Sequence, residues 1–100
     1  MSPKLVRDRI PSIIVENKKT PHFYHANDEE FGIRLKEKLV EEVHEFLESE
    51  DAKELADIIE VIEALARYQE KSLGDILQMK KEKALTNGSF SGKIILTDIK

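Results

Sequence analysis

Two consecutive stretches of the chain, residues 27–49 and 51–71, repeat apolar residues at helical spacing along their whole length. At about 3.6 residues per turn, each repeat places its apolar residues on one broad face of a helix. The first face comprises Phe31, Leu35, Leu39, Val43, Phe46 and Leu47, and the second comprises Leu55, Ile58, Ile59, Val61, Ile62, Leu65 and Ala66. The sequence therefore predicts an all-α fold built around a hairpin of two long amphipathic helices.

Four carboxylates interrupt these apolar faces instead of lying on the polar sides. Glu42 falls inside the first face and Glu45 lies at its edge, while Glu54 and Asp57 interrupt the second face. An unpaired buried carboxylate costs several kcal/mol or stays protonated, so a group of them needs a cation. Residues three apart on a helix lie roughly 5 to 6 Å apart at Cβ, so each pair can converge on one ion. Oxygen ligands favour Mg²⁺, with Mn²⁺ as an alternative.

Two other interpretations of these acidic helices stay open. Charged helices carry ExxE and ExxD strings by chance, and 36% of this chain is charged, so either string alone is weak evidence. Glu41 and His44 also match the carboxylate–histidine element of di-iron bundles. That element requires a second ExxH, where this chain has ExxD, and His44 projects away from the apolar face. A magnesium site is therefore the favoured hypothesis.

The acidic strings belong to a wider resemblance. EExxE at residues 41–45 followed by ExxD at residues 54–57 resembles the signature of the MazG-type all-α nucleotide pyrophosphohydrolases, a superfamily that includes phosphoribosyl-ATP pyrophosphohydrolases and dimeric dUTPases. The opening residues 4–11 (KLVRDRIP) and the closing NGSF and IIL strings are similar to a house-cleaning branch of that superfamily, which clears unwanted nucleoside triphosphates. Only eight residues separate Glu45 from Glu54, fewer than is usual in the superfamily, which shortens the turn between the helices.

The resemblance implies a Mg²⁺-dependent hydrolase that cleaves a nucleoside triphosphate between its α- and β-phosphates and releases a monophosphate and pyrophosphate. The implied metal ligands are Glu42, Glu45, Glu54 and Asp57, and the candidate catalytic residues are Glu41, Glu42 and Glu45. Glu41 lies off the apolar face; it would orient a ligand or the attacking water, with a plain solvated glutamate as the alternative. The opening segment favours a non-standard nucleotide as substrate. A non-catalytic helical interaction or nucleotide-binding module is the rival hypothesis.

A triphosphate also needs cationic partners, because phosphate oxygens bind Arg and Lys strongly. The candidates are Arg7, Arg9, Lys38, Lys80, Lys81 and Lys83. Lys38 lies four residues before Glu42, so a salt bridge within the helix is its simpler role. Arg7 and Arg9 flank Asp8, and a local ion pair competes with substrate binding there. For the lysines near the C-terminus, a solvated helix face is the simpler interpretation.

Length and composition narrow the class of protein. One hundred residues predict a single small domain, 1–100, whose core would be thin on its own. One hairpin cannot cover faces this wide, so we expect a homodimer or higher oligomer with a four-helix-bundle core. The chain has no cysteine, no apolar signal segment and no run of roughly 18 apolar residues, which predicts a cytoplasmic protein that does not span a membrane. A net charge of −4 argues against nucleic-acid binding.

Capping residues predict where the helices begin. Asn27 with Glu30 predicts a cap and a capping box at the start of the first long helix, which reaches about Ser49. Asp51 caps the second long helix, which is expected to reach about Lys71.

Shorter elements flank the hairpin. A short helix is expected over residues 8–17, because Ile10, Ile13 and Ile14 would form an apolar face. Pro11 is tolerated in the first turn of a helix. Ser72 with Asp75 predicts the start of a last helix that Gly88 ends. Residues 94–97 predict a short strand or an extended C-terminal segment.

Overall fold

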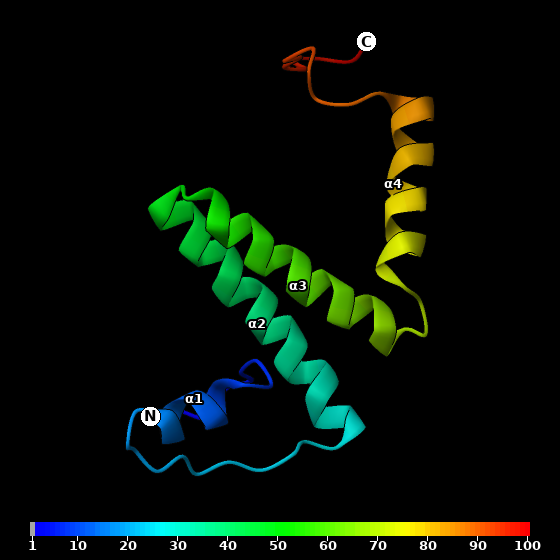
Figure 1. Ribbon diagram of the computed structural model, residues 1–100. Coiled ribbons are helices and arrows are strands. Elements are labelled where there is room, and N and C mark those ends of the chain that lie inside the picture. Colours follow the sequence, from blue (N-terminus) through cyan, green and yellow to red (C-terminus); the bar gives the residue numbers. More distant parts are fainter. Residues whose placement is uncertain (1) are drawn as a thin grey trace.

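The computed structural model describes residues 2–100, and within that range it contains four helices and no strand. The helices are α1 (Ile10–Glu16), α2 (Asp28–Ser49), α3 (Ala52–Tyr68) and α4 (Leu73–Asn87). α2 and α3 lie side by side as an antiparallel hairpin, and α4 follows the C-terminal end of α3 (Figure 1). The predicted all-α class is confirmed.

Polar side chains cap the three longer helices at the predicted positions. The side chain of Asn27 accepts the backbone N–H of Glu30 at 2.9 Å, and Asp51 accepts the N–H two residues further on at 2.9 Å. Ser72 and Asp75 form a reciprocal capping box, with bonds of 2.8 and 3.0 Å. Each bond satisfies a backbone donor that the first turn of a helix leaves free. The starts of these helices are therefore set by local sequence.

The turn between α2 and α3 depends on one residue with left-handed backbone. Glu50 has a φ of 55°, and its N–H donates to the carbonyl of Phe46 at 2.7 Å. A non-glycine residue in this conformation costs about 1 kcal/mol or more. The next residue already caps α3, so the chain reverses at once and the two helices are forced into contact.

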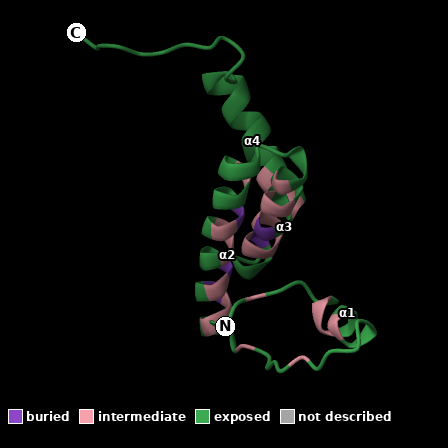
Figure 2. Cartoon of the chain, turned by 90° about the vertical axis from the view of Figure 1, so that its left-hand side faces the viewer, coloured by how far each residue is buried: buried purple, intermediate pink, exposed green. Residues whose placement is uncertain are grey.

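The core is small and is confined to the contact between α2 and α3. Leu35 on α2 is 2% exposed, and Val61 and Ala66 on α3 are also buried. In Figure 2 the buried positions lie on these two helices only, and α4 and the C-terminal tail are almost entirely exposed. The structural consequence is a rigid hairpin with lightly attached ends.

The open end of the hairpin is closed by a tyrosine. Tyr68 lies so close to Gly32 that a Cβ on this glycine would fall 2.5 Å from the tyrosine hydroxyl oxygen. The hydroxyl donates to the backbone carbonyl of Asp28 at 3.0 Å, and the ring meets Phe31 edge-on at a centroid distance of 6.1 Å. A glycine at this point of α2 is therefore required by close packing.

Two helices are shorter than the sequence predicted. α1 begins at Ile10 instead of Asp8, and α3 ends at Tyr68 instead of about Lys71. Glu70 adopts a φ of 60°, and the N–H of Lys71 turns back to the carbonyl of Ala66 at 2.8 Å. This left-handed residue ends α3 earlier, because it cannot continue a right-handed helix.

One further local prediction was wrong, and the strand alternative for residues 94–97 is not formed. Glu30 does not complete a capping box with Asn27, because its carboxylate accepts hydrogen bonds from Tyr24 and Arg34 instead. Residues 94–97 form no strand; they lie in a tail without regular secondary structure, which leads away from α4 (Figures 1 and 2). A strand needs a neighbour to pair with, and the described chain offers none there.

Apolar side chains stay exposed on the hairpin. Val40 and Leu47 on α2 and Leu55 and Ile59 on α3 expose between 45% and 65% of their surface. Within residues 2–100, no helix has the length and apolar character that crossing a membrane requires. The hairpin alone leaves part of its apolar surface in contact with water.

Candidate metal centre

Glu42 is the buried charged residue of the hairpin. It is 8% exposed, and its Oε2 atom is buried without a hydrogen-bond partner. Oε1 lies 3.6 Å from the Nζ atom of Lys38, one turn earlier on α2. Burial raises the pKa of the Glu42 carboxyl above its ordinary value, and repulsion from the Glu45 carboxylate adds to the rise. A carboxylate in this position lacks one partner for its negative charge.

Two carboxylates of α3 converge on Glu42. Glu42, Glu54 and Asp57 each offer an oxygen, and the three oxygens lie within 4.8 Å of one another. Glu54 and Asp57 are half-buried and lie one turn apart on α3, as their three-residue spacing predicts. Burial raises the pKa of the Glu54 carboxyl, and repulsion from Glu45 is the next largest cause. The hairpin therefore concentrates negative charge at one point between its two helices.

A second group of carboxylates overlaps the first. Glu41, Glu42 and Glu45, all on α2, also offer oxygens within 4.8 Å of one another. Glu42 belongs to both groups, so the four predicted ligands do not form one compact set. Glu45 is exposed in this chain, which differs from the inward position that the sequence predicted. Its place at the edge of the apolar arc explains the difference, because a helix edge faces water unless another element covers it.

Three basic side chains approach the carboxylates. Lys38 lies 3.2 Å from Glu41 in addition to its contact with Glu42. Arg7 Nη2, in the N-terminal segment, donates to Asp57 Oδ1 on α3 at 2.7 Å, although the two residues lie 50 positions apart in the sequence. Lys4 Nζ lies 3.9 Å from Glu41. The N-terminal segment therefore reaches the acidic centre through two cations.

The structure separates the predicted phosphate-binding residues into two sets. Arg7 and Lys38 lie at the acidic centre, as described above. Arg9 makes no ion pair in the part of the chain that the structure describes, and Lys80 and Lys83 are exposed on α4, also without an ion pair to the acidic centre within residues 2–100. Lys4 was missed by the sequence analysis. Its basic charge in the N-terminal segment was the available signal, but only the folded path of that segment brings it to Glu41.

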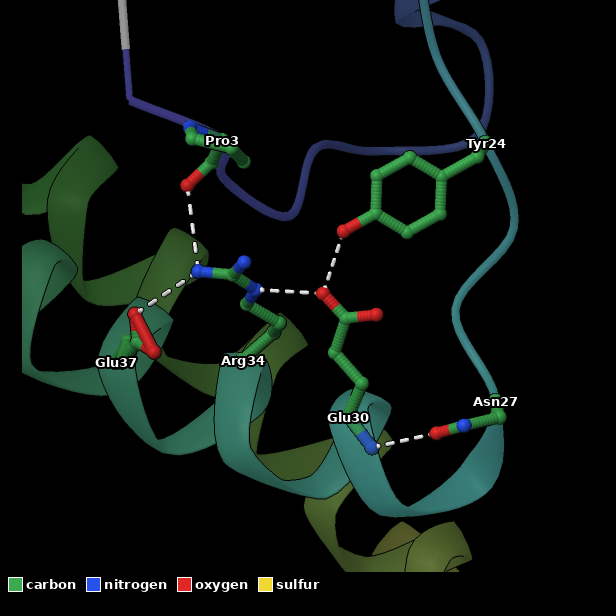
Figure 3. Close-up of polar contacts among 6 residues, drawn as sticks. All are labelled: Pro3, Tyr24, Asn27, Glu30, Arg34 and Glu37. Atoms are coloured by element: carbon green, nitrogen blue, oxygen red, sulfur yellow. Dashed lines mark hydrogen bonds and ion pairs between the residues drawn. The ribbon is translucent and has the colours of Figure 1, made fainter.

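A hydrogen-bond network holds the N-terminal segment against α2 (Figure 3). Arg34 Nη1 donates to the backbone carbonyl of Pro3 at 3.4 Å and lies 3.5 Å from Glu37, while its Nε donates to Glu30 at 3.2 Å. Tyr24 donates to the same Glu30 oxygen at 2.5 Å. The Tyr24 bond is the main cause that lowers the pKa of the Glu30 carboxyl, so this acid stays ionised beside Arg34. The network connects the N-terminal segment, the loop before α2 and α2 itself.

The acidic centre fits a hard divalent cation. Carboxylate oxygens are the ligands that Mg²⁺ and Mn²⁺ prefer, and three of them from two helices converge here. The orphaned oxygen of Glu42 supports this fit, since exposed acidic clusters carry no such buried, unpartnered atom. No family model, curated protein or solved structure matches the chain.

Proposed function

We propose that the chain is a Mg²⁺-dependent nucleoside triphosphate pyrophosphohydrolase, which cleaves between the α- and β-phosphates to give a nucleoside monophosphate and pyrophosphate. The observation that carries this proposal is the buried, unpartnered oxygen of Glu42 among the convergent carboxylates of Glu54 and Asp57. The likeness of the acidic strings to MazG-type enzymes supplies the reaction. The convergence of these carboxylates supports the proposal, because such a reaction needs a bound cation.

Each acidic residue has a distinct proposed role. Glu42, Glu54 and Asp57 would hold Mg²⁺, with Mn²⁺ as an alternative, and Glu45 would join them from the edge of α2. When bound, the cation stabilises negative charge on the phosphoryl oxygens. Glu45 is exposed and can accept a proton from the attacking water. Glu41 is held by Lys38 and serves to orient its neighbours.

Basic side chains at the same place support a polyphosphate substrate. Lys38, Arg7 and Lys4 lie beside the carboxylates and can turn toward phosphate oxygens. Phosphate would contact the remaining candidates only if substrate or another subunit reached them. These are Arg9, near the N-terminus, and Lys80, Lys81 and Lys83 on α4. A non-standard nucleotide is the proposed substrate, on the resemblance of the opening segment, and a cytoplasmic location follows from the same role.

The exposed apolar faces support a homodimer. Val40 and Leu47 on α2 and Leu55 and Ile59 on α3 leave apolar surface uncovered. A second hairpin packed on these faces would complete the four-helix bundle that the sequence predicted. We propose the dimer, or a higher oligomer built from it, as the functional form.

Pyrophosphate release tests the enzyme directly. The protein is incubated with a panel of standard, deaminated and oxidised nucleoside triphosphates, with and without Mg²⁺. We expect Mg²⁺-dependent release from at least one nucleotide, and a loss of at least 100-fold in Glu42→Gln and Asp57→Asn. Glu60→Gln is the matched control, because Glu60 is an exposed acid of α3 outside both carboxylate groups. Absence of Mg²⁺-dependent release from every nucleotide contradicts the proposal.

A non-catalytic helical interaction module is the second candidate. The exposed apolar faces of the hairpin favour it, because such faces serve association whether or not the acids bind metal. This candidate predicts an oligomer whose stability and assembly do not change with Mg²⁺. A rise of the thermal midpoint with Mg²⁺ in wild type, absent in Glu42→Gln, distinguishes the metal-binding enzyme from the module.

A further inference from the structure

The N-terminal segment, residues 3–9, places a guanidinium directly on a proposed metal ligand. Arg7 Nη2 lies 2.7 Å from Asp57 Oδ1. Asp57 at the same time offers an oxygen to the group that includes Glu42, whose buried Oε2 has no partner. The positive charge of Arg7 thus stands at the border of the place where a divalent cation would lie.

This segment is hydrogen-bonded at two points, one before Arg7 and one at Arg7 itself. The carbonyl of Pro3 accepts from Arg34, and the carbonyl of Arg7 itself accepts the N–H of Ile10 at 3.1 Å, where α1 begins. Between these points Lys4 reaches Glu41 at 3.9 Å. The hydrogen bond from Arg34 and the ion pairs of Lys4 and Arg7 therefore keep the segment beside the carboxylates.

The Arg7 ion pair is accessible enough to exchange. The side chain of Arg7 is 56% exposed and that of Asp57 is 38% exposed. Exposed ion pairs contribute little to stability and are readily broken. A divalent cation bound by Asp57 would compete with Arg7 for the same carboxylate. An arginine released beside a metal-bound triphosphate has a better partner, because its planar donors fit phosphate oxygens bidentately.

We propose that Arg7 is a substrate-anchoring residue which Asp57 holds until the divalent cation binds. In the metal-free protein Arg7 neutralises Asp57, and in the metal-bound protein it turns to the triphosphate. The proposal rests on the proposed function, because it requires the metal centre. Arg7 would thus compete with the divalent cation for Asp57 and would bind the triphosphate.

Opposite changes in two affinities test the proposal. Binding of Mn²⁺ alone is measured by electron paramagnetic resonance, and binding of inorganic triphosphate in the presence of Mn²⁺ is measured by calorimetry. In Arg7→Gln we expect Mn²⁺ to bind about two- to fivefold more tightly, the scale of an exposed ion pair. We expect Mn²⁺–triphosphate to bind about tenfold more weakly, the scale of a charge-assisted contact.

Arg9→Gln is the matched control for the binding of Mn²⁺ alone. It removes the same charge two residues away, from a side chain that makes no ion pair within residues 2–100. If both variants tighten Mn²⁺ binding equally, the effect is general electrostatics and the proposal is overturned. The proposal is also overturned if Arg7→Gln binds both Mn²⁺ and Mn²⁺–triphosphate more tightly, binds both more weakly, or changes neither affinity. If the wild-type protein binds no Mn²⁺, the metal centre itself fails; if it binds Mn²⁺ but the opposite changes are missing, only the role of Arg7 fails.

Discussion

A carboxylate oxygen of Glu42 on α2 lies within 4.8 Å of one on Asp57 of α3, and the pKa of the Glu42 carboxyl is raised chiefly by burial. The two helices are joined by a tight turn, which keeps the backbones that carry these acids close together. The metal-free protein therefore folds against electrostatic repulsion at this point. Two of the predictions below follow from it.

Glu42→Gln should stabilise the metal-free protein at neutral pH. The amide keeps the shape of the side chain and removes a buried negative charge, although it also loses the contact with Lys38. We expect the free energy of unfolding to rise by on the order of 1 kcal/mol. Urea unfolding in the presence of a chelator measures it. Glu60→Gln, on the exposed side of α3, should change the stability little, and a clear loss of stability in Glu42→Gln would contradict the repulsion.

The same substitution should lose its advantage in acid. The folded-state pKa of Glu42 lies above its unfolded value of about 4.5, so its protonated form favours folding. This contribution is fully present below pH 4.5 and is lost as the pH rises through the folded-state pKa. The difference in unfolding free energy between Glu42→Gln and wild type should therefore shrink toward zero as the pH falls to 4.5. A difference that stays constant between pH 8 and 4.5 would show that charge is not its cause.

Gly32→Ala should destabilise the hairpin by about 1–2 kcal/mol. The new methyl group would collide with the ring of Tyr68 and displace its hydroxyl from the carbonyl of Asp28. Overpacking and a lost hydrogen bond outweigh the gain of about 1 kcal/mol that alanine brings to a helix. Thermal or urea unfolding measures the change. In a Tyr68→Ala background the collision is absent, so the same substitution should become neutral or stabilising.

Ser72→Ala should loosen α4 without unfolding the hairpin. Ser72 and Asp75 cap each other, and α4 packs on α3 alone among the described helices. Loss of such a cap costs about 1 kcal/mol, which we expect in faster amide exchange within α4 and not in α2 or α3. Uniformly faster exchange in all helices would contradict the separate behaviour of α4.

The wild-type capping box should also weaken in acid. Hydrogen bonds from the backbone and side chain of Ser72 lower the pKa of the Asp75 carboxyl below its ordinary value. Its contribution is present above the unfolded pKa and is lost as the pH falls through the lowered one. The protection factors of the α4 amides, corrected for the intrinsic exchange rate at each pH, should therefore fall at low pH in wild type, and far less in Asp75→Asn.

Leu47→Asp should separate the proposed dimer. Leu47 is 65% exposed on α2, and a charge there would have to be buried when two hairpins pack together. Analytical ultracentrifugation should show a dimer for wild type and a monomer for the variant. Thr86→Asp, at the exposed end of α4, should leave the dimer intact. A monomeric wild type at all concentrations contradicts the proposed bundle.

Local features of this fold were predictable, and tertiary ones were not. Asn27 and Ser72 reveal helix starts because a cap bonds to its own first turn. The convergence of Glu54 and Asp57 also follows from helical spacing, once the two helices are known to pair. The contact between Arg7 and Asp57 depends on how residues 17–27 loop around, and no periodicity in the sequence encodes that path.

The side chains of Glu30 and Glu45 lie differently from the prediction. Glu30 could bond to the backbone at its own helix start, but its carboxylate accepts from Tyr24 and Arg34 instead, which lie six and four residues away. Glu45 lies at the edge of the apolar face on a helical projection and faces water, because no other element within residues 2–100 covers it.

The guanidinium of Arg34, which lies apart from Glu42, Glu54 and Asp57, donates to the carbonyl of Pro3 and so holds one end of the segment that carries Arg7. In a tethered chain, such an attachment sets the effective concentration of one group at another. By this contact Arg34 helps to keep the guanidinium of Arg7 close to Asp57. A side chain remote from the carboxylates in this way influences the positive charge that surrounds them.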